Sequence, residues 1–453
     1  MNFIKSIVFR TKVKEEKALH LSNEREEFTG KENESYWRVV KKQFQKNKIA
    51  VWSLRIVYLF IIIAILADFL ANEKPIAVKY NGNIYFPIFK EYVVDLGLSK
   101  WDKELVNVSW KELNYEWKIL PLIPYLPKNI DFLNTSVSPF DEQQVISKKW
   151  KHWLGTDALG HDVLAGMIHG TRIALLVGII SMGIAALIGI FFGAIAGYYG
   201  DDQLKMSISS IILYSVGFVI ALFYAFGARA YVLADALGNS FGNFLLELII
   251  SILLFLGILL VFQFFSFLLK KIPFLFQPIT IPVDIIISRL IEVVVSIPRL
   301  FLIISIAAVV AKPSIFMVMM IIGLTTWTGI ARFTRAELLR IRNLEYIEAA
   351  KALGYKEFRI IIKHALPNAL SPILISIAFG IASAILIEST LSFIGIGVPA
   401  ETITWGSLLA AARQDASAWW LAIFPGFAIF ITVTIYNLIG EGLTDAMNPK
   451  LKQ

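Results

Sequence analysis

The amino-acid sequence predicts an all-α polytopic membrane protein with a small extracytoplasmic subdomain. Of the 453 residues, 57% are hydrophobic and only 17% are charged, whereas soluble domains carry about 25% charged residues. The chain contains eight apolar runs, and a membrane-spanning helix needs roughly 20 such residues. Lys and Arg collect in particular segments between these runs, which is typical of cytoplasmic loops.

The first predicted span is Ile49–Leu70, and Arg55 near its start can extend back to the lipid headgroups. Residues 1–48 before it are highly charged and show no short apolar core with a cleavage site, so the first run is expected to be an uncleaved anchor. The later predicted spans are Ile173–Tyr199, Ile208–Tyr231, Phe244–Leu269, Ile281–Ala311 broken by Pro298, Ile315–Ala331, Ile373–Ile394 and Trp419–Leu438.

Residues 71–165 separate the first two spans and form the predicted extracytoplasmic segment. They include strand-like pieces in residues 77–89 (AVKYNGNIYFPIF), many aromatics and prolines, and nearly balanced charges. We expect a small ordered subdomain here rather than a linker. The second span then carries recurring glycines, which permit close helix contact: Gly183, Gly189, Gly193 and Gly197.

The positive charges favour one orientation of the spans. Lys270-Lys271, the segment 332–369 and the C-terminal tail are all basic. With eight spans they fall on the same side as the charged N-terminal segment, so both termini are expected in the cytoplasm.

The segment Glu348–Pro367 has an ordered pattern inside this basic loop. A first apolar face at helical spacing precedes Gly354, which stands where a left-handed cap ends a helix, and a second apolar stripe is ended by Leu366-Pro367. The first face consists of Tyr346, Ala349, Ala350 and Leu353, and the second of Phe358, Ile361, Ile362 and Ala365. Two short amphipathic helices joined by glycine predict a docking surface for a soluble partner. The competing interpretation is an ordinary amphipathic helix on the membrane surface.

Missing residue types exclude several chemistries. The chain has no Cys, which excludes disulfides, thiolate metal sites and cysteine catalysis. The pair Gly30-Lys31 is followed by Glu32 and lacks the upstream glycine of a phosphate-binding loop. His161 and His169 show no metal-ligand pattern. We therefore expect no catalytic residue, cofactor or metal site in this chain, and basic tracts that alternate with spans do not indicate nucleic acid.

Charged residues inside predicted spans are candidates for function because charges are costly in lipid, and the candidates named here are Arg289, Glu292 and Glu388. Arg289 and Glu292 are three residues apart on one helix, so they are placed to form either a structural pair or a substrate contact. Glu388 is placed to line a pathway, to hold a partner subunit or to lie near a helix end.

The segment EAAKALGYKEFRIIIKHALP resembles the EAA motif of the permease subunits of ATP-binding-cassette (ABC) importers. The matching positions are Glu348, Ala349, Ala350, Gly354, His364, Leu366 and Pro367. The general motif prefers an aliphatic residue at position 364, whereas the stretch HALPN is similar to the dipeptide and oligopeptide branch, where a histidine is usual. Further similar stretches are HWLGTDALGHDV (152–163), GYYGD (197–201), SIPRLFL (296–302), LTTWTGIARFTRAE (324–337), LIESTLSFIGIGVP (386–399) and FPGFAIFITVTIYNLIGEGLTDAMNP (424–449).

The resemblance covers roughly Trp150–Asp201 and Ile281–Pro449. It implies a permease transmembrane domain over residues 166–453 with a type I importer core of six helices and a cytoplasmic EAA coupling loop at residues 332–369. Two parts depart from the family: residues 71–149 are longer than usual, and residues 202–280 insert two further spans. Two insertions preserve the orientation of everything downstream.

The resemblance implies a transport subunit and not an enzyme, with ATP and Mg²⁺ bound by partner ATPase subunits. The implied partners are a second homologous permease, two ABC ATPase subunits and an extracytoplasmic substrate-binding protein, in a bacterial plasma (inner) membrane. Closure of the ATPase dimer would move Glu348–Lys363 as a unit and switch the pore. The implied substrate is a peptide or similar small solute, with dipeptide, oligopeptide, nickel chelate and antibiotic peptide left open. The alternative is an ion-gradient-driven secondary transporter, and a membrane enzyme would need a catalytic cluster that the sequence lacks.

Overall fold

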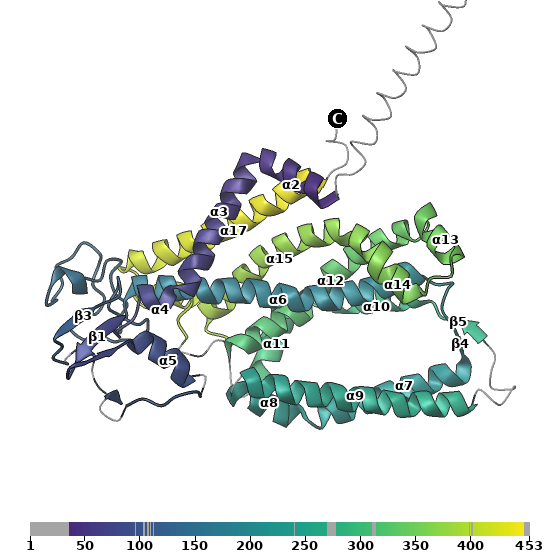
Figure 1. Ribbon diagram of the computed structural model, residues 1–453, viewed down its shortest axis with the longest axis horizontal. Coiled ribbons are helices and arrows are strands. Elements are labelled where there is room, and N and C mark those ends of the chain that lie inside the picture. The colour runs from purple at the N-terminus through teal and green to yellow at the C-terminus, as the bar shows by residue number, and fades with distance from the viewer. Residues whose placement is uncertain are drawn as a thin grey trace, which may run out of the picture.

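The computed structural model describes residues 36–447, except 96, 103–104, 107, 109, 112, 240, 270–277, 310–313, 398 and 400–401. The described part is mostly helical (Figure 1) and has seven helices that are long and apolar enough to span a membrane. A helix pair bent by 79° makes an eighth span when it is counted as one. The eight predicted spans are therefore all present as helices. The expectations for residues 1–35, for Lys270-Lys271 and for the basic tail fall outside the described residues.

The spanning helices follow the predicted order along the chain. They are α3 (Lys48–Ile65), α6 (Val163–Tyr199), α7 (Ile208–Leu222) with the π-helical turn η3 (Phe223–Gly227), α9 (Phe241–Leu269), the bent pair α10 (Val283–Ser296) and α11 (Arg299–Val309), α12 (Ile315–Ile341), α15 (Leu366–Ile394) and α17 (Trp419–Met447). Side chains of Asn47, Asp162 and Ser314 accept hydrogen bonds from the first turns of α3, α6 and α12, which satisfies backbone donors that have no partner within a helix. Pro298 lies at the bend between α10 and α11.

Most span boundaries differ from the prediction by a few residues or more, and two of them illustrate the reasons. The first span ends at Ile65 rather than Leu70, because Leu66 leaves helical geometry before the short helix α4 (Ala67–Leu70). The sixth continues past Ala331 to Ile341. Its buried face extends into this stretch, with Leu338 and Ile341 fully buried, so packing prolongs the helix beyond the end of the apolar run.

The core of the molecule is the close contact of α6 with α12. A β-carbon added at Gly189, Gly193 or Gly197 would lie 2.5–2.7 Å from atoms of α12, so only glycine permits this approach. The prediction of close contact is confirmed for these three positions. It is wrong for Gly183, where a β-carbon would meet nothing within 4 Å. Helices α15 and α17 complete the bundle, α3 packs on α17, and α2 (Tyr36–Lys46) packs on the end of α17 (Figure 1).

The inserted segment forms a separate helical hairpin. Helix α7 packs along α9, and α8 (Ala230–Asn239) packs against α9 at one end (Figure 1). Arg229 joins the two arms through Glu247 and through Ser251, 3.0 Å away. At the other end, β4 (Lys205–Ser207) pairs antiparallel with β5 (Pro278–Thr280), with Met206 opposite Ile279. The hairpin is thus attached to the core through a two-stranded clip.

The outer segment is ordered and contains a small sheet, so the description all-α needs correction for this part. Strand β1 (Ala77–Tyr80) pairs antiparallel with β2 (Asn83–Tyr85) and with β3 (Trp117–Ile119). The turn between β1 and β2 is Asn81-Gly82, both at positive φ, as a tight two-residue hairpin requires. Helix α5 (Pro87–Asp95) follows β2. A buried cluster ties the segment to the start of α6: Ala71, Ile123, Tyr125, Trp150 and Ala165.

Candidate coupling site

The EAA segment lies at the end of the bundle opposite the outer segment (Figure 1). Helix α13 (Glu345–Ala352) is followed by a turn in which Gly354 has φ +76°. This left-handed conformation is strained for any residue with a β-carbon, and it confirms the predicted glycine elbow. Helix α14 (Glu357–Ile360) then runs through a π-helical turn (Ile361–Ala365) into α15. The second short helix therefore does not end at Leu366-Pro367, because Pro367 occupies the first turn of α15, where its missing N–H costs nothing.

The predicted apolar faces of this segment are only partly correct. Ala350 is buried, but its buried companion on α13 is Ile347, and both belong to the main core. Ile361 and Ala365 are buried as part of the second stripe. Leu353 and Phe358 instead point outward and are 73% and 75% exposed, and Glu348, Ala349 and Gly354 are also exposed. One apolar face thus packs the segment against the main core, and a second apolar face points outward.

Tyr198, near the end of α6, braces the segment from behind. Its hydroxyl donates to the carboxylate of Glu357 on α14, and the ammonium of Lys351 on α13 lies 5.3 Å from the centre of its ring. Tyr199 meets the Tyr198 ring edge-on at 5.5 Å. Both short helices are therefore attached to one side chain of α6.

His364 contributes to the internal order of the segment. Its ring stacks on Tyr355 with 5.9 Å between the ring centroids, and the guanidinium of Arg359 lies 4.8 Å from the Tyr355 ring. The side chain of Asn368 donates to the carbonyl of His364 at 2.7 Å and to the Tyr346 hydroxyl at 3.2 Å. This connects α15 with α13. Burial raises the pKa of Tyr346 above its ordinary value of 10.0, so this phenol stays neutral at physiological pH.

One ion pair, one hydrogen bond and one close packing contact join the ends of the neighbouring helices. Arg335 on α12 binds both carboxylate oxygens of Asp284 on α10, with 2.6 Å between Nη2 and Oδ2. Asp201, just after α6, accepts from the backbone N–H of Ile285 at 3.1 Å. Arg342 at the end of α12 reaches the turn after α6, where a β-carbon on Gly200 would lie 2.1 Å from its Nη1. Three helices thus meet next to the coupling segment as one rigid end.

The intramembrane candidates occupy two different environments. Arg289 and Glu292 form the predicted pair, with 2.6 Å between Nη1 and Oε2, and their side chains are 74% and 57% exposed. Glu388 is 1% exposed and accepts from the Ser392 hydroxyl at 2.6 Å. A β-carbon on Gly406 of α16 (Trp405–Ala411) would lie 2.5 Å from the backbone oxygen of Ser389. Glu388 therefore lies at the contact of α15 with α16, inside the subunit.

The contacts of several polar residues were not predicted from the sequence. Tyr198, Asp284 and Arg335 have partners 51 to 159 residues away. In the outer segment, buried His152 lies between Asp162, at 2.8 Å from Nδ1, and Asp131, at 3.3 Å from Nε2. Tyr198, His152, Asp162 and Arg335 lie within the stretches GYYGD, HWLGTDALGHDV and LTTWTGIARFTRAE, which was their only signal. Asp131 and Asp284 lie in none of these stretches. Among the described residues, no group of three or more His, Cys, Asp or Glu is arranged to hold a metal ion.

Comparisons with known proteins agree with this architecture. Residues 279–453 match the family described as binding-protein-dependent transport system inner membrane component, and residues 35–87 match the N-terminal TM domain of oligopeptide transport permease C. The inner membrane ABC transporter permease protein YejE of Escherichia coli (strain K12) is 28% identical over 421 residues, which cover 92% of this chain and 97% of the relative. The dipeptide transport system permease protein DppC of Bacillus subtilis (strain 168) is 29% identical and covers 67% of this chain and 70% of its own length.

Two further matches complete the comparison. The peptidoglycan transport system permease protein YejE of Agrobacterium fabrum is 26% identical over 90% of this chain and 92% of its own length. Among solved structures, the inward-facing MetNI methionine ABC transporter is 18% identical and covers 36% of this chain and 76% of that chain. Its TM-score is 0.31, a likeness too weak to bear on the fold.

Proposed function

The chain belongs to the binding-protein-dependent transport system inner membrane components, since two matched models of such permeases cover about half of its length, and from this premise we propose how it works. It is the permease subunit of an ABC importer. We infer that it forms half of a translocation pore, together with a second homologous permease, in the bacterial inner membrane with both termini in the cytoplasm. Two ABC ATPase subunits, which bind ATP and Mg²⁺, and an extracytoplasmic binding protein complete the proposed assembly.

The observation that carries the proposal is the pair α13 and α14 around Gly354. Their outward face exposes Leu353 and Phe358, while Tyr198 and the buried Ile347 fix the pair to the bundle. A protein that receives force by contact needs an exposed surface with a stiff attachment behind it. Glu348, Ala349, Ala350, Gly354, His364, Leu366 and Pro367 are the residues that we assign to this coupling.

The proposed substrate is a peptide. Support comes from the names of relatives, which include a dipeptide permease in Bacillus subtilis, and from His364 in the stretch HALPN. We propose that ATPase partners, and not an ion gradient, drive peptide import through this chain. The alternative of an ion-gradient-driven secondary transporter is not favoured, because the matched family consists of components of binding-protein-dependent transport systems.

Reconstitution tests the proposal directly. The permease, purified with its copurifying subunits and placed in proteoliposomes with its binding protein, is expected to take up a radiolabelled dipeptide or oligopeptide only when ATP and Mg²⁺ are present on the ATPase side. Collapse of proton and sodium gradients by ionophores should leave this uptake unchanged. Uptake that persists without ATP and disappears with the ionophores would establish the alternative instead.

A further inference from the structure

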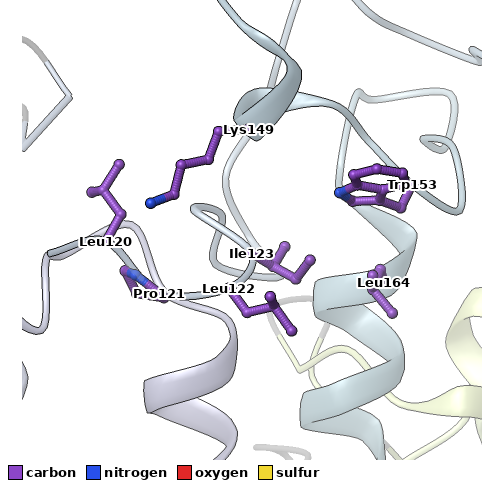
Figure 2. A pocket seen from close by; sticks show the side chains of 7 residues that line it. All are labelled: Leu120, Pro121, Leu122, Ile123, Lys149, Trp153 and Leu164. Carbon is purple, nitrogen blue, oxygen red and sulfur yellow. The ribbon is translucent and has the colours of Figure 1, made fainter.

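A pocket of about 640 Å³ opens where the outer segment meets the start of α6 (Figure 2). Its lining is almost entirely apolar and contains one charged side chain, Lys149. The other lining residues are Leu120, Pro121, Leu122, Ile123, Trp153 and Leu164. Nothing in the coupling mechanism uses this pocket. The outer segment, where the pocket opens, lies at the opposite end of the bundle from α13 and α14 (Figure 1).

The pocket has a rigid floor and an exposed rim. Ile123 is 2% exposed and pairs with the chain after α4, donating to the carbonyl of Leu70 at 2.8 Å and accepting from the N–H of Asn72 at 3.1 Å. Leu122 and Trp153 at the rim are 70% and 54% exposed. Clustered exposed apolar side chains on a protein surface mark interaction sites. The exposed rim therefore leaves the pocket accessible to another molecule.

The height of the pocket above the membrane follows from an ion pair on α6. Arg172 binds Asp68 at 2.7 Å, and because charges are costly in hydrocarbon we take this pair as the outer boundary of the hydrocarbon. Leu164 is eight residues closer to the start of the helix, which places it about 12 Å farther out. The headgroup layer on each side is only about 5–8 Å thick. The pocket thus opens above the lipid headgroups, into water.

The charge around the pocket selects the chemistry of its occupant. Lys148 and Lys149 are exposed, and Lys151 follows two residues later. Three lysines therefore fall within four residues of the sequence, beside the pocket lining. An apolar cavity with the ammonium group of Lys149 at its rim fits an apolar side chain that is flanked by a carboxylate.

We propose that this pocket is the docking point for an apolar side chain and a neighbouring carboxylate of the extracytoplasmic substrate-binding protein. The inference rests on the proposed function, because it needs an importer that works with such a protein. The soluble partner is favoured over a lipid because of the height of the pocket. Leu122 and Trp153 hold the apolar side chain, and Lys149 pairs with the carboxylate.

A single-cysteine experiment tests the docking, because the chain has no Cys of its own. The variant Leu122→Cys is assembled with its partner subunits in lipid nanodiscs and labelled with a membrane-impermeant maleimide. The control is Leu98→Cys, another exposed leucine of the outer segment, which does not line the pocket. Adding purified binding protein from the same transport system is expected to slow labelling about tenfold at position 122 at saturation, and to leave position 98 unchanged.

A functional measurement accompanies the labelling. Leu122→Asp and Lys149→Glu are expected to raise the binding-protein concentration that half-maximally stimulates ATP hydrolysis by about tenfold, as for loss of an interface anchor worth about 1.4 kcal/mol. Leu98→Asp and Lys100→Glu, on the same segment, should match the wild type. The maximal stimulated rate should stay unchanged in all four, because the pocket lies outside the coupling segment.

Three outcomes would overturn the inference in different ways. Unchanged labelling at position 122, in a wild-type-like complex that the binding protein does stimulate, would show that docking occurs elsewhere. Protection of position 122 by lipid nanodiscs alone, compared with detergent, would identify a lipid as the occupant. A wild-type complex that no binding protein stimulates would contradict the proposed function itself, and the docking inference with it.

Discussion

The hydroxyl of Tyr198 on α6 donates to the carboxylate of Glu357 on α14. The two residues are 159 positions apart, and the bond joins the central helix of the core to the segment that we assign to ATPase contact. Because Lys351 on α13 also contacts the Tyr198 ring, one side chain holds both short helices. We propose that movement of the pair is transmitted through this side chain to α6, and not only along α15.

Tyr198→Phe removes this hydroxyl and keeps the ring. Loss of one such bond costs about 1 kcal/mol, so the fold should persist with a small decrease in thermal stability. We expect fewer peptides imported per ATP hydrolysed, measured in proteoliposomes as the ratio of uptake to phosphate release. Tyr199→Phe is the matched control, because the edge-on ring contact remains. An unchanged ratio in Tyr198→Phe would show that α6 does not transmit the movement.

Gly354 allows a test that separates backbone conformation from side-chain size. A β-carbon there would meet nothing within 4 Å, so the cost of substitution comes from φ +76° alone. Asn tolerates this conformation far better than Val. Gly354→Val is expected to abolish ATP-driven uptake while the protein remains in the membrane, whereas Gly354→Asn should retain much of it. Equal uptake by both variants would show that the turn is not needed.

The pair Arg335–Asp284 should stabilise the end of the bundle. Asp284 is mostly buried, so Arg335→Ala leaves a carboxylate without its partner. Removing one partner of a fully buried pair lowers the free energy of unfolding by about 3–5 kcal/mol. Because the Arg335 side chain is one-third exposed, we expect a loss of about 1–3 kcal/mol here. Tryptophan fluorescence during heating measures the loss. The exposed pair Arg289–Glu292 serves as the control, and Arg289→Ala should shift the transition far less.

The ion pair of Asp68 with Arg172, next to the outer segment, should make the stability of the fold depend on pH in the acid range. Burial opposes ionisation of Asp68, but hydrogen bonds from Arg172 and Tyr92 outweigh it and hold the pKa of Asp68 below 3.8. The ionised carboxylate therefore contributes stability above pH 3.8 that is lost as the pH falls through the lower folded-state pKa. Asp68→Asn should lower the unfolding temperature at neutral pH, and the difference from wild type should close below pH 3.8. Asp95→Asn, an exposed carboxylate on α5, should show no such convergence.

The sequence predicted the elements whose signals are local. Hydropathy located the spans because each must be apolar along its whole length, and the spacing around Gly354 located the turn because few residues adopt positive φ. The strand-like pieces expected in residues 77–89 likewise correspond to β1 and β2. These features depend on residues within a few positions of one another, so no knowledge of the tertiary contacts was needed.

The errors concern the direction in which a residue faces. Helix α13 carries apolar residues on two faces, and the pattern alone did not tell that Ile347 turns inward while Tyr346 and Leu353 turn outward. Gly183 has the same local signal as Gly193, yet only Gly193 meets α12. The contact of Tyr198 with Glu357 joins residues from distant parts of the chain, so only the folded structure reveals it.

The clip between β4 and β5 has a consequence for how the hairpin α7–α9 relates to the rest of the chain. Lys205 lies opposite Thr280, so the points where the chain leaves and rejoins the bundle are about 5 Å apart, the spacing of neighbouring strands. A link of a few residues spans that gap. We therefore expect that the hairpin can be removed and the chain rejoined by such a link without a change in the positions of α6 and α10.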